Sequence, residues 1–367
     1  MKKYYFIIFI IILILIFIIL FFKCSKEIRI TVKEKEIKDE MKKIAPFIKE
    51  KITKLSIEEQ KIYNYEVLIL KIDADGNCIF AKTLEGPYTD WADFIIQTKD
   101  GGYILAGRNY SLENNVDKIF ISKLNKKFEI EWNKTYDEMD REVKSIELKD
   151  GYLIIGKTQN VYLAKTDEKG NFIWIRTLGQ EFYESGYYAL NTKDRATMIL
   201  GLTEDVSEIK TDVYLTKKKK DVHKNFVFGG NEYDWGYCLT EIKDGYIITG
   251  LTFSFGNGKS DVYLIKTDMD GNCVFAKTIG KDGYDEGLSV LETKDGFIIT
   301  GATTSQNRDD YDVLIVKTDF NGNLIWMKNF GYELDDVGYC IEKTDDNCYI
   351  IAGTAGIRSL KKEEDKE

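Results

Sequence analysis

The sequence predicts an all-β protein, a six-bladed β-propeller of four-stranded blades, with a transmembrane helix at its N-terminus. A unit of about 49 residues recurs six times, which is a length typical of one propeller blade. Each unit contains two pairs of runs rich in β-branched and aromatic residues, and each pair flanks a tight turn. The chain also begins with a long apolar run, which is typical of a membrane-spanning helix.

The repeat is clearest near the C-terminus. The segment from Asp261 reads DVYLIKTDMDGNCVFAKTIG, and the segment from Asp312 reads DVLIVKTDFNGNLIWMKNFG. Each predicts a hairpin about a D-x-x-G-N turn, in which glycine can adopt positive φ. A second hairpin about a K-D-G turn follows, as in GLSVLETKDGFIITG from Gly287. By analogy with WD-repeat propellers, the K-D-G hairpin supplies strands a and b of a blade, and the D-x-x-G-N hairpin supplies strands c and d.

The phase of the repeat predicts how the propeller closes. The repeat region, residues 66–356, opens with a c–d hairpin at 66–83 and finishes with an a–b hairpin at 337–354. We therefore expect these two hairpins to form one mixed blade. Such a blade closes the ring and leaves no open sheet edge between the two ends of the repeat region.

These hairpins resemble the repeats of prokaryotic cell-surface β-propeller proteins. The resemblance lies in DVYLIKTDMDGN from Asp261 and IKDGYIITG from Ile242, and it extends over the whole repeat region. The same hairpins are distantly similar to quinoprotein and kelch-type propeller repeats. The resemblance implies the fold and says little about activity.

The N-terminal segment predicts a membrane anchor. Residues 4–22, YYFIIFIIILILIFIILFF, carry no charge, and a helix of this length is close to the thickness of a hydrocarbon core. Lys2 and Lys3 favour a cytoplasmic N-terminus, which places the propeller on the extracytoplasmic side. Lipidation of Cys24 and cleavage of the segment are the alternatives. Outside the propeller we thus expect a cytoplasmic tip and transmembrane anchor at 1–24, a charged helical connector at 25–65 and a charged tail at 357–367.

Composition excludes several classes of function. The net charge of −9 makes nucleic acid an unsuitable partner. The only histidine is His223, which excludes a site built on several histidines of one chain. We expect no cofactor other than a divalent cation.

An acidic residue stands just before each predicted strand a. These six residues are Asp90, Asp140, Glu184, Asp234, Asp285 and Asp336. If strand a lines a central channel, six carboxylates surround one mouth of it and could bind a divalent cation such as calcium. The alternative is an Asx-turn, in which each carboxylate accepts the backbone N–H two residues later. That later position is glycine in four copies, which are Gly186, Gly236, Gly287 and Gly338.

The d–a and b–c loops are expected on one face of the propeller, and they vary in length. Variable loops on a rigid scaffold are where recognition normally occurs. This face is rich in aromatic residues, whose planes suit a sugar ring or a peptide. The candidate ligand-binding residues are Trp91, Tyr110, Tyr183, Tyr233, Trp235, Phe253, Phe255 and Tyr284.

The function that these features favour is binding without catalysis. We expect a single-pass membrane protein whose propeller binds a protein or a glycan at the cell surface. One alternative is an envelope assembly or scaffold protein, and another is a glycan-active or quinone-dependent propeller enzyme. Almost every polar feature is repeated, whereas an enzyme requires a unique polar cluster.

Overall fold

The structure is a computed structural model, and it describes residues 63–84, 89–111, 116–136, 143–148, 150–157, 161–178, 186–203, 211–219, 222–304, 310–331 and 334–358. All described residues belong to one unit of the chain, Tyr63–Glu367. The predicted anchor and nearly all of the predicted connector and tail lie outside the described residues. Within the described ranges, no helix is long and apolar enough to span a membrane.

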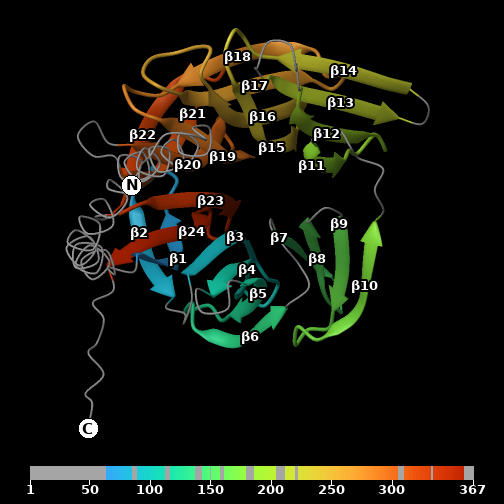
Figure 1. The fold of residues 1–367 in the computed structure, drawn as a ribbon, viewed down its shortest axis with the longest axis vertical. Helices are drawn as coiled ribbons and strands as arrows, with labels where there is room; N and C mark the ends of the chain where they lie inside the picture. The colour runs from blue at the N-terminus through green and yellow to red at the C-terminus, as the bar shows by residue number, and fades with distance from the viewer. Residues whose placement is uncertain are drawn as a thin grey trace, which may run out of the picture. The chain divides into compact units, whose positions relative to one another are not determined.

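The described residues form six four-stranded antiparallel sheets, which confirms the all-β prediction (Figure 1). Five sheets each contain four consecutive strands, hydrogen-bonded in the order a, b, c, d. These five sheets consist of β3 (Thr89–Gln97), β4 (Tyr103–Ser111), β5 (Val116–Leu124) and β6 (Ile130–Tyr136); β7 (Val143–Leu148), β8 (Gly151–Lys157), β9 (Val161–Thr166) and β10 (Phe172–Leu178); β11 (Gly186–Asn191), β12 (Thr197–Leu202), β13 (Val213–Lys219) and β14 (Val222–Phe228); β15 (Asp234–Ile242), β16 (Gly245–Thr252), β17 (Asp261–Asp268) and β18 (Cys273–Ile279); and β19 (Asp285–Glu292), β20 (Phe297–Thr304), β21 (Tyr311–Thr318) and β22 (Leu324–Phe330).

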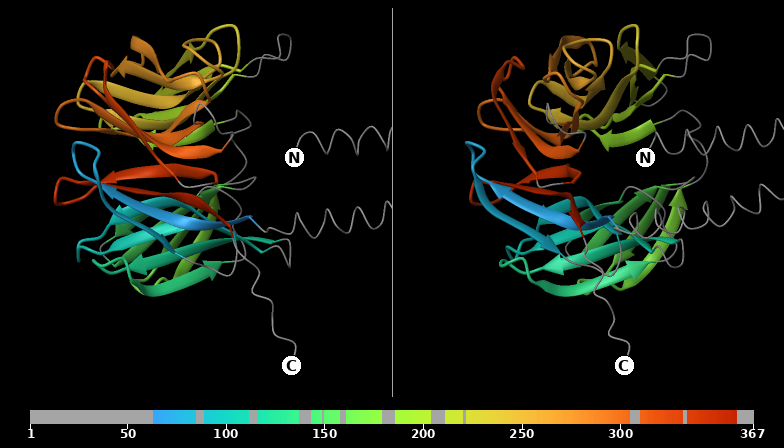
Figure 2. Two further views of the ribbon diagram at one scale, coloured as in Figure 1. Left: turned by 90° about the vertical axis from the view of Figure 1, so that its left-hand side faces the viewer. Right: turned by 60° about the vertical axis from the view of Figure 1, so that its left-hand side comes forward.

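The sixth sheet joins the two ends of the described chain. It is ordered β2-β1-β24-β23, and its strands are β1 (Tyr63–Ile72), β2 (Cys78–Leu84), β23 (Asp336–Lys343) and β24 (Tyr349–Arg358). Strand β1 pairs with β24 in ten residue pairs, from Tyr63–Arg358 to Ile72–Tyr349. Figure 2 shows the blue β1 beside the red β24. The predicted pairing of the first c–d hairpin with the last a–b hairpin is therefore present.

The D-x-x-G-N turns are held by their own aspartate. In the first turn, Asp73 Oδ1 accepts the backbone N–H of Asp75 at 2.9 Å and that of Asn77 at 2.8 Å. The Asn77 side chain donates to Asp73 Oδ2 at 2.9 Å, and Gly76 has a φ of 73°. These hydrogen bonds, above all from Asn77, lower the pKa of Asp73. The turns at Asp167, Asp268 and Asp319 repeat this arrangement.

The turn glycine also receives an aromatic ring from the preceding sheet. A Cβ atom on Gly76 would lie 2.5 Å from the ring of Trp326, which belongs to β22. The same geometry joins Gly170 to Trp132 of β6, at 2.7 Å. Rings on strand d thus pack on the c–d turn of the next sheet, and a side chain at the glycine would displace them.

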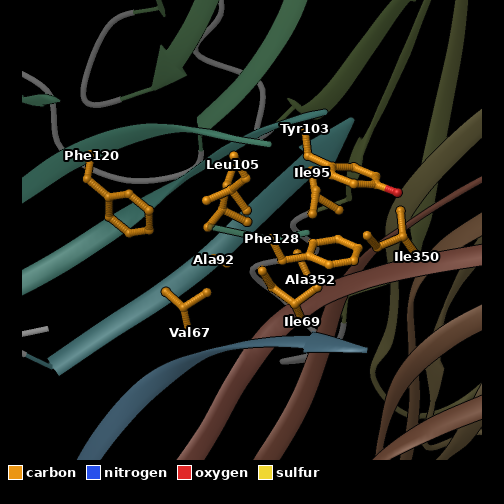
Figure 3. Packing of buried hydrophobic residues seen from close by; sticks show 11 residues of the cluster. Val67, Ile69, Ala92, Ile95, Tyr103, Leu105, Phe120, Phe128, Ile350 and Ala352 are labelled. Atoms are coloured by element: carbon orange, nitrogen blue, oxygen red, sulfur yellow. The ribbon is translucent and has the colours of Figure 1, made fainter. Parts of the chain in front are cut away.

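The core lies between the sheets. Five buried apolar clusters each combine side chains from two sheets that follow one another along the chain or through the mixed sheet. Figure 3 shows Val67 and Ile69 of β1 packed with Ala92 and Ile95 of β3. Burial of these side chains away from water binds each sheet to its neighbour.

Strand a approaches the preceding sheet closely at one glycine. A Cβ atom on Gly287 of β19 would lie 2.1 Å from Thr249 Oγ1 of β16, and 3.0 Å from a methyl group of Val262 of β17. Likewise, a Cβ atom on Gly338 of β23 would lie 2.4 Å from Thr300 Oγ1 of β20. These glycines are therefore required for packing between sheets.

We predict that Gly287→Ala lowers the free energy of unfolding by about 1–3 kcal/mol, because the added methyl group overpacks the junction. In a double-mutant cycle, Thr249→Ala should recover part of this loss by removing the clashing atom. Thr249→Val puts a methyl group where Thr249 Oγ1 stood, so it should recover none of the lost free energy of unfolding. Urea unfolding is measured for the native chain, the three single variants and the two double variants, and strict additivity of Gly287→Ala and Thr249→Ala would contradict the packing described.

Candidate ligand-binding site

The d–a and b–c loops lie at one edge of the sheets, as the sequence predicts. In the β19–β22 sheet, Asp285 at the start of strand a pairs with Thr303, and Thr303 pairs with Asp312 near the start of strand c. Val313 then pairs with Phe330, the last residue of strand d. The starts of a and c and the ends of b and d therefore share one edge, called the loop edge below.

Five of the aromatic candidates lie in or directly beside three neighbouring loops at this edge, and they are Tyr233, Trp235, Phe253, Phe255 and Tyr284. The loops are joined by backbone hydrogen bonds. Phe253 N–H donates to the Tyr233 carbonyl at 2.9 Å. Lys259 N–H donates to the Gly283 carbonyl at 3.0 Å, and Asp285 N–H donates to the Ser260 carbonyl at 2.9 Å. The three loops thus form one connected surface.

Some of these rings face solvent and others are held by polar partners. Tyr233 is 37% exposed, Phe253 38% and Phe255 46%. Trp235 Nε1 donates to Thr211 Oγ1 at 2.6 Å, and the Lys259 ammonium lies 4.6 Å from the centre of the Tyr284 ring. The exposed rings are available for contact, whereas Trp235 and Tyr284 have partners within the protein.

Two more candidates, Trp91 and Tyr110, lie in the β3–β6 sheet. Trp91 stacks on Tyr65 of β1 with ring centres 6.2 Å apart, and the guanidinium of Arg108 lies 5.7 Å from the centre of the Trp91 ring. The structure thus divides the aromatic candidates between two places. Tyr183 lies outside the described residues.

Four of the six predicted acidic residues are described, and all four are buried. Asp234, Asp285 and Asp336 are the first residues of β15, β19 and β23, and each has no exposed surface. Asp90 is the second residue of β3 and is 7% exposed. Asp140 and Glu184 lie outside the described residues.

The Asx-turn interpretation of these aspartates is wrong where the contacts are described. Asp285 Oδ2 accepts the backbone N–H of Lys281 at 2.7 Å, and Asp234 Oδ2 accepts that of Gly230 at 2.7 Å. The donor is thus four residues before the aspartate and not two residues after it. The glycine two residues later, such as Gly287, is required by packing against the preceding sheet.

Each described aspartate of this row faces a second acidic residue that sequence reasoning missed. A Cβ atom on Gly280 would lie 1.8 Å from Asp261 Oδ1 and 2.8 Å from Asp285 Oδ2, so the two carboxylates flank the same point. The second set of acidic residues stands in the first half of strand c or directly before it, and its described members are Glu66, Asp212, Asp261 and Asp312. The signal was present in the sequence, because four of the six DVYLIKT-like segments open with an acidic residue.

Burial raises the pKa of two members of these carboxyl pairs, and the neighbouring carboxylate adds to the effect. Burial raises the pKa of Asp90 to about 7, and the charge of Glu66 adds to the effect. Burial also raises the pKa of Asp261 to about 6, opposed by a backbone hydrogen bond from Asn257 and assisted by the charge of Asp285. Burial alone raises the pKa of Glu286 to about 7.

A cation between the paired acids stays a prediction. Among the described residues, no group of three or more His, Cys, Asp or Glu side chains is placed to hold a metal ion. Asp234 Oδ1 and Asp285 Oδ1 are buried and accept no hydrogen bond from a described residue. A proton on one member of a pair would relieve repulsion between the two carboxylates at such a site.

Comparison with known proteins gives structural likenesses only. No protein-family model matches the chain, and no curated protein matches it. A protein of unknown function from Bacteroides caccae is similar at 9% identity and a TM-score of 0.42, over 72% of this chain and 93% of that one. The Dos1 propeller is similar at 12% identity and a TM-score of 0.36, over 78% of this chain and 81% of that one.

The β-propeller domain of the Trilobed protease from Pyrococcus furiosus is similar at 11% identity and a TM-score of 0.33. The likeness covers 83% of this chain and 95% of that one. At these values the likenesses carry no information on function. The six four-stranded sheets and the cores between them identify the fold as a β-propeller.

We predict that stability falls as the pH rises from 5 to 8. The pKa values of Asp90 and Asp261 are raised in the folded state, so the folded protein binds more protons than the unfolded chain in this range. Each group can contribute a slope of up to about 1.4 kcal/mol per pH unit between its unfolded and folded pKa. Urea unfolding at several pH values measures the slope.

Asp261→Asn should flatten this pH dependence, because an amide keeps the size of the side chain without its charge. If the free energy of unfolding is constant or rises between pH 5 and 8, Asp90 and Asp261 are not buried carboxyl groups with raised pKa values. Repeating the series with calcium and with a chelator distinguishes a proton from a cation, since a bound cation would stabilise the protein at the higher pH.

Proposed function

We propose that this protein is a single-pass membrane protein whose extracytoplasmic, closed six-bladed propeller binds a protein or a glycan through its loop edge without catalysis. The observation that carries the proposal is the connected surface of three loops, on which Tyr233, Phe253 and Phe255 expose their rings. Exposed aromatic planes beside polar loops suit sugar rings and peptide segments.

Closure of the ring is part of the proposal. The buried clusters join β7–β10 to β3–β6, then to the mixed sheet, and on through β19–β22 and β15–β18 to β11–β14. One junction remains, between β7–β10 and β11–β14. Because all six sheets have the same strand order, packing of the same kind at this junction would complete a six-bladed ring.

The membrane anchor is proposed from the sequence. The uncharged residues 4–22 are long enough to span a bilayer, and Lys2 and Lys3 favour a cytoplasmic N-terminus. This orientation places the propeller outside the cell membrane. A loop edge with exposed rings would then meet ligands at the cell surface.

The repeated charged residues support binding over catalysis, because they already have structural partners. Lys266 of strand c pairs with Asp244 of the a–b turn at 2.8 Å, and Lys317 pairs with Asp295 at 2.6 Å. These ion pairs join strand c to the a–b turn of the same sheet. The repeat therefore forms a scaffold, and recognition falls to side chains that are not repeated.

The experiment uses intact cells that produce the full-length chain and measures binding of fluorescent glycans and peptides to their surface. We expect cells with the native chain to bind a subset of these ligands. Phe253→Ala with Phe255→Ala should reduce that binding at least about tenfold, since buried aromatic anchors commonly contribute 2 kcal/mol or more.

Phe320→Ala is the matched control. Phe320 is 41% exposed and lies 5.8 Å from one other ring, as Phe255 lies 6.0 Å from Tyr263, but it belongs to a c–d turn at the opposite edge. Its loss should leave binding unchanged. Equal binding by all variants, or no surface binding by the native chain, would count against the proposal.

A further inference from the structure

The chain contains two Asn-Gly sequences, Asn257–Gly258 and Asn321–Gly322, and both asparagine side chains are exposed. In such a sequence the backbone nitrogen of the glycine can attack Cγ of the asparagine, because glycine carries no side chain that hinders the approach. The attack requires the nitrogen and Cγ to come into contact. The surroundings of each pair therefore decide whether it reacts.

The Asn321–Gly322 pair is held inside a c–d turn. Gly322 N–H donates to the Asp319 carbonyl at 3.0 Å, and Asn321 N–H donates to Asp319 Oδ1 at 2.9 Å. Gly322 is buried, and a Cβ atom on it would lie 2.7 Å from the ring of Phe275. The nitrogen of Gly322 is thus both hydrogen-bonded and covered, so this pair must open its turn before it reacts.

The Asn257–Gly258 pair lies in the loop between β16 and β17 and lacks these restraints. Asn257 and Gly258 are both exposed, and residues 253–259 belong to no strand. The backbone N–H of Asn257 donates to the Asp261 carboxylate. In the part of the chain that the structure describes, no hydrogen bond holds the Gly258 N–H or the Asn257 side chain. The nitrogen that attacks and the amide that is attacked are both exposed to water.

We propose that Asn257 is a site of spontaneous deamidation in the folded protein, whereas the turn protects Asn321. The Gly258 nitrogen loses its proton and bonds to Asn257 Cγ, the Cγ–Nδ2 bond breaks, and ammonia leaves with the proton. The product is a cyclic imide. Water then adds to one of the two imide carbonyl carbons and opens the ring, which leaves an aspartate or an isoaspartate at position 257. The inference does not depend on the proposed function.

Deamidation would add a negative charge beside an existing carboxyl pair. A Cβ atom on Gly256 would lie 1.9 Å from Asp261 Oδ2, so the loop that carries Asn257 closes around the Asp261 carboxylate. That carboxylate already faces Asp285. A third carboxylate at position 257 therefore increases the repulsion at this point of the loop edge.

The isoaspartate product would also change the backbone. Its main chain runs through the side-chain carbon and is longer by one carbon atom before Gly258. Lys259 N–H, directly after this glycine, donates to the Gly283 carbonyl at 3.0 Å and joins the loop to its neighbour. The longer main chain would shift Lys259 and weaken that hydrogen bond. Because the ammonia is lost, the proportion of altered loops increases with the age of the protein.

Incubation of the full-length protein in heavy-oxygen water at neutral pH tests the proposal. The protein is digested in ordinary water, so that mass spectrometry counts only the conversion that occurred in the folded state. We expect the Asn257 peptide to gain one heavy oxygen atom at least about tenfold faster than the Asn321 peptide, because Asn321 must first lose the hydrogen bonds of its turn.

Two comparisons test the physical reason. In urea the turn is lost, so the two asparagines should convert at nearly equal rates. Asp319→Ala removes the carboxylate that accepts the Asn321 N–H, so it should accelerate conversion at Asn321 and leave the rate at Asn257 unchanged. Thermal melting verifies that this variant is folded, and the urea series decides the question if it is not.

Hydrogen exchange measures the effect on the loop. The Lys259 amide should exchange faster in incubated protein than in fresh protein, and Asn257→Gln, whose longer side chain closes a larger ring more slowly, should show no such change. Unchanged exchange in converted protein would show that the contact with Gly283 survives. The proposal itself is overturned if Asn257 gains no heavy oxygen in the folded protein, if Asn257 and Asn321 convert equally fast there, or if urea leaves their ratio unchanged.

Discussion

The pairing of β1 with β24 is the interaction on which the rest of the propeller depends. It joins segments from the two ends of the described chain in a ladder of ten residue pairs. Without it, β1–β2 and β23–β24 would be two separate hairpins, and an isolated hairpin is marginally stable in water. The resulting sheet contributes to two cores, since Ile69 and Ala352 pack toward β3–β6, while Leu70 and Ile351 pack toward β19–β22.

Much of this architecture could be predicted, because each turn carries its own chemistry. The D-x-x-G-N segments specify a turn locally through the aspartate, and the order of hairpins specifies the mixed sheet. The buried aspartates at the start of strand a, such as Asp285, could also be predicted, but the acidic residues that face them could not. The opposing Asp261 or Asp312 belongs to the preceding sheet, and spacing along the chain does not show which residues of two sheets meet. For the same reason, the role of Gly287 is visible only in contact with Thr249.

The candidate site was predictable in part. Loop aromatics such as Phe253 and Phe255 were predicted from variable loop length, and they are exposed as a recognition surface requires. Repeated glycines, turns and ion pairs fix the backbone, and the loops at the loop edge present side chains that differ from one repeat to the next.

Hydrogen exchange of the backbone amides in β1 tests the central role of the mixed sheet most directly. In the full-length protein, we expect amides of β1 and β24 to be protected to the same extent, because they open together. In a chain that ends at Gly331, β1 loses its partner, so its amides should exchange as fast as those of an unfolded chain, and protection should also fall in β3 and β20. Persistent protection of β1 in the shortened chain would contradict the account.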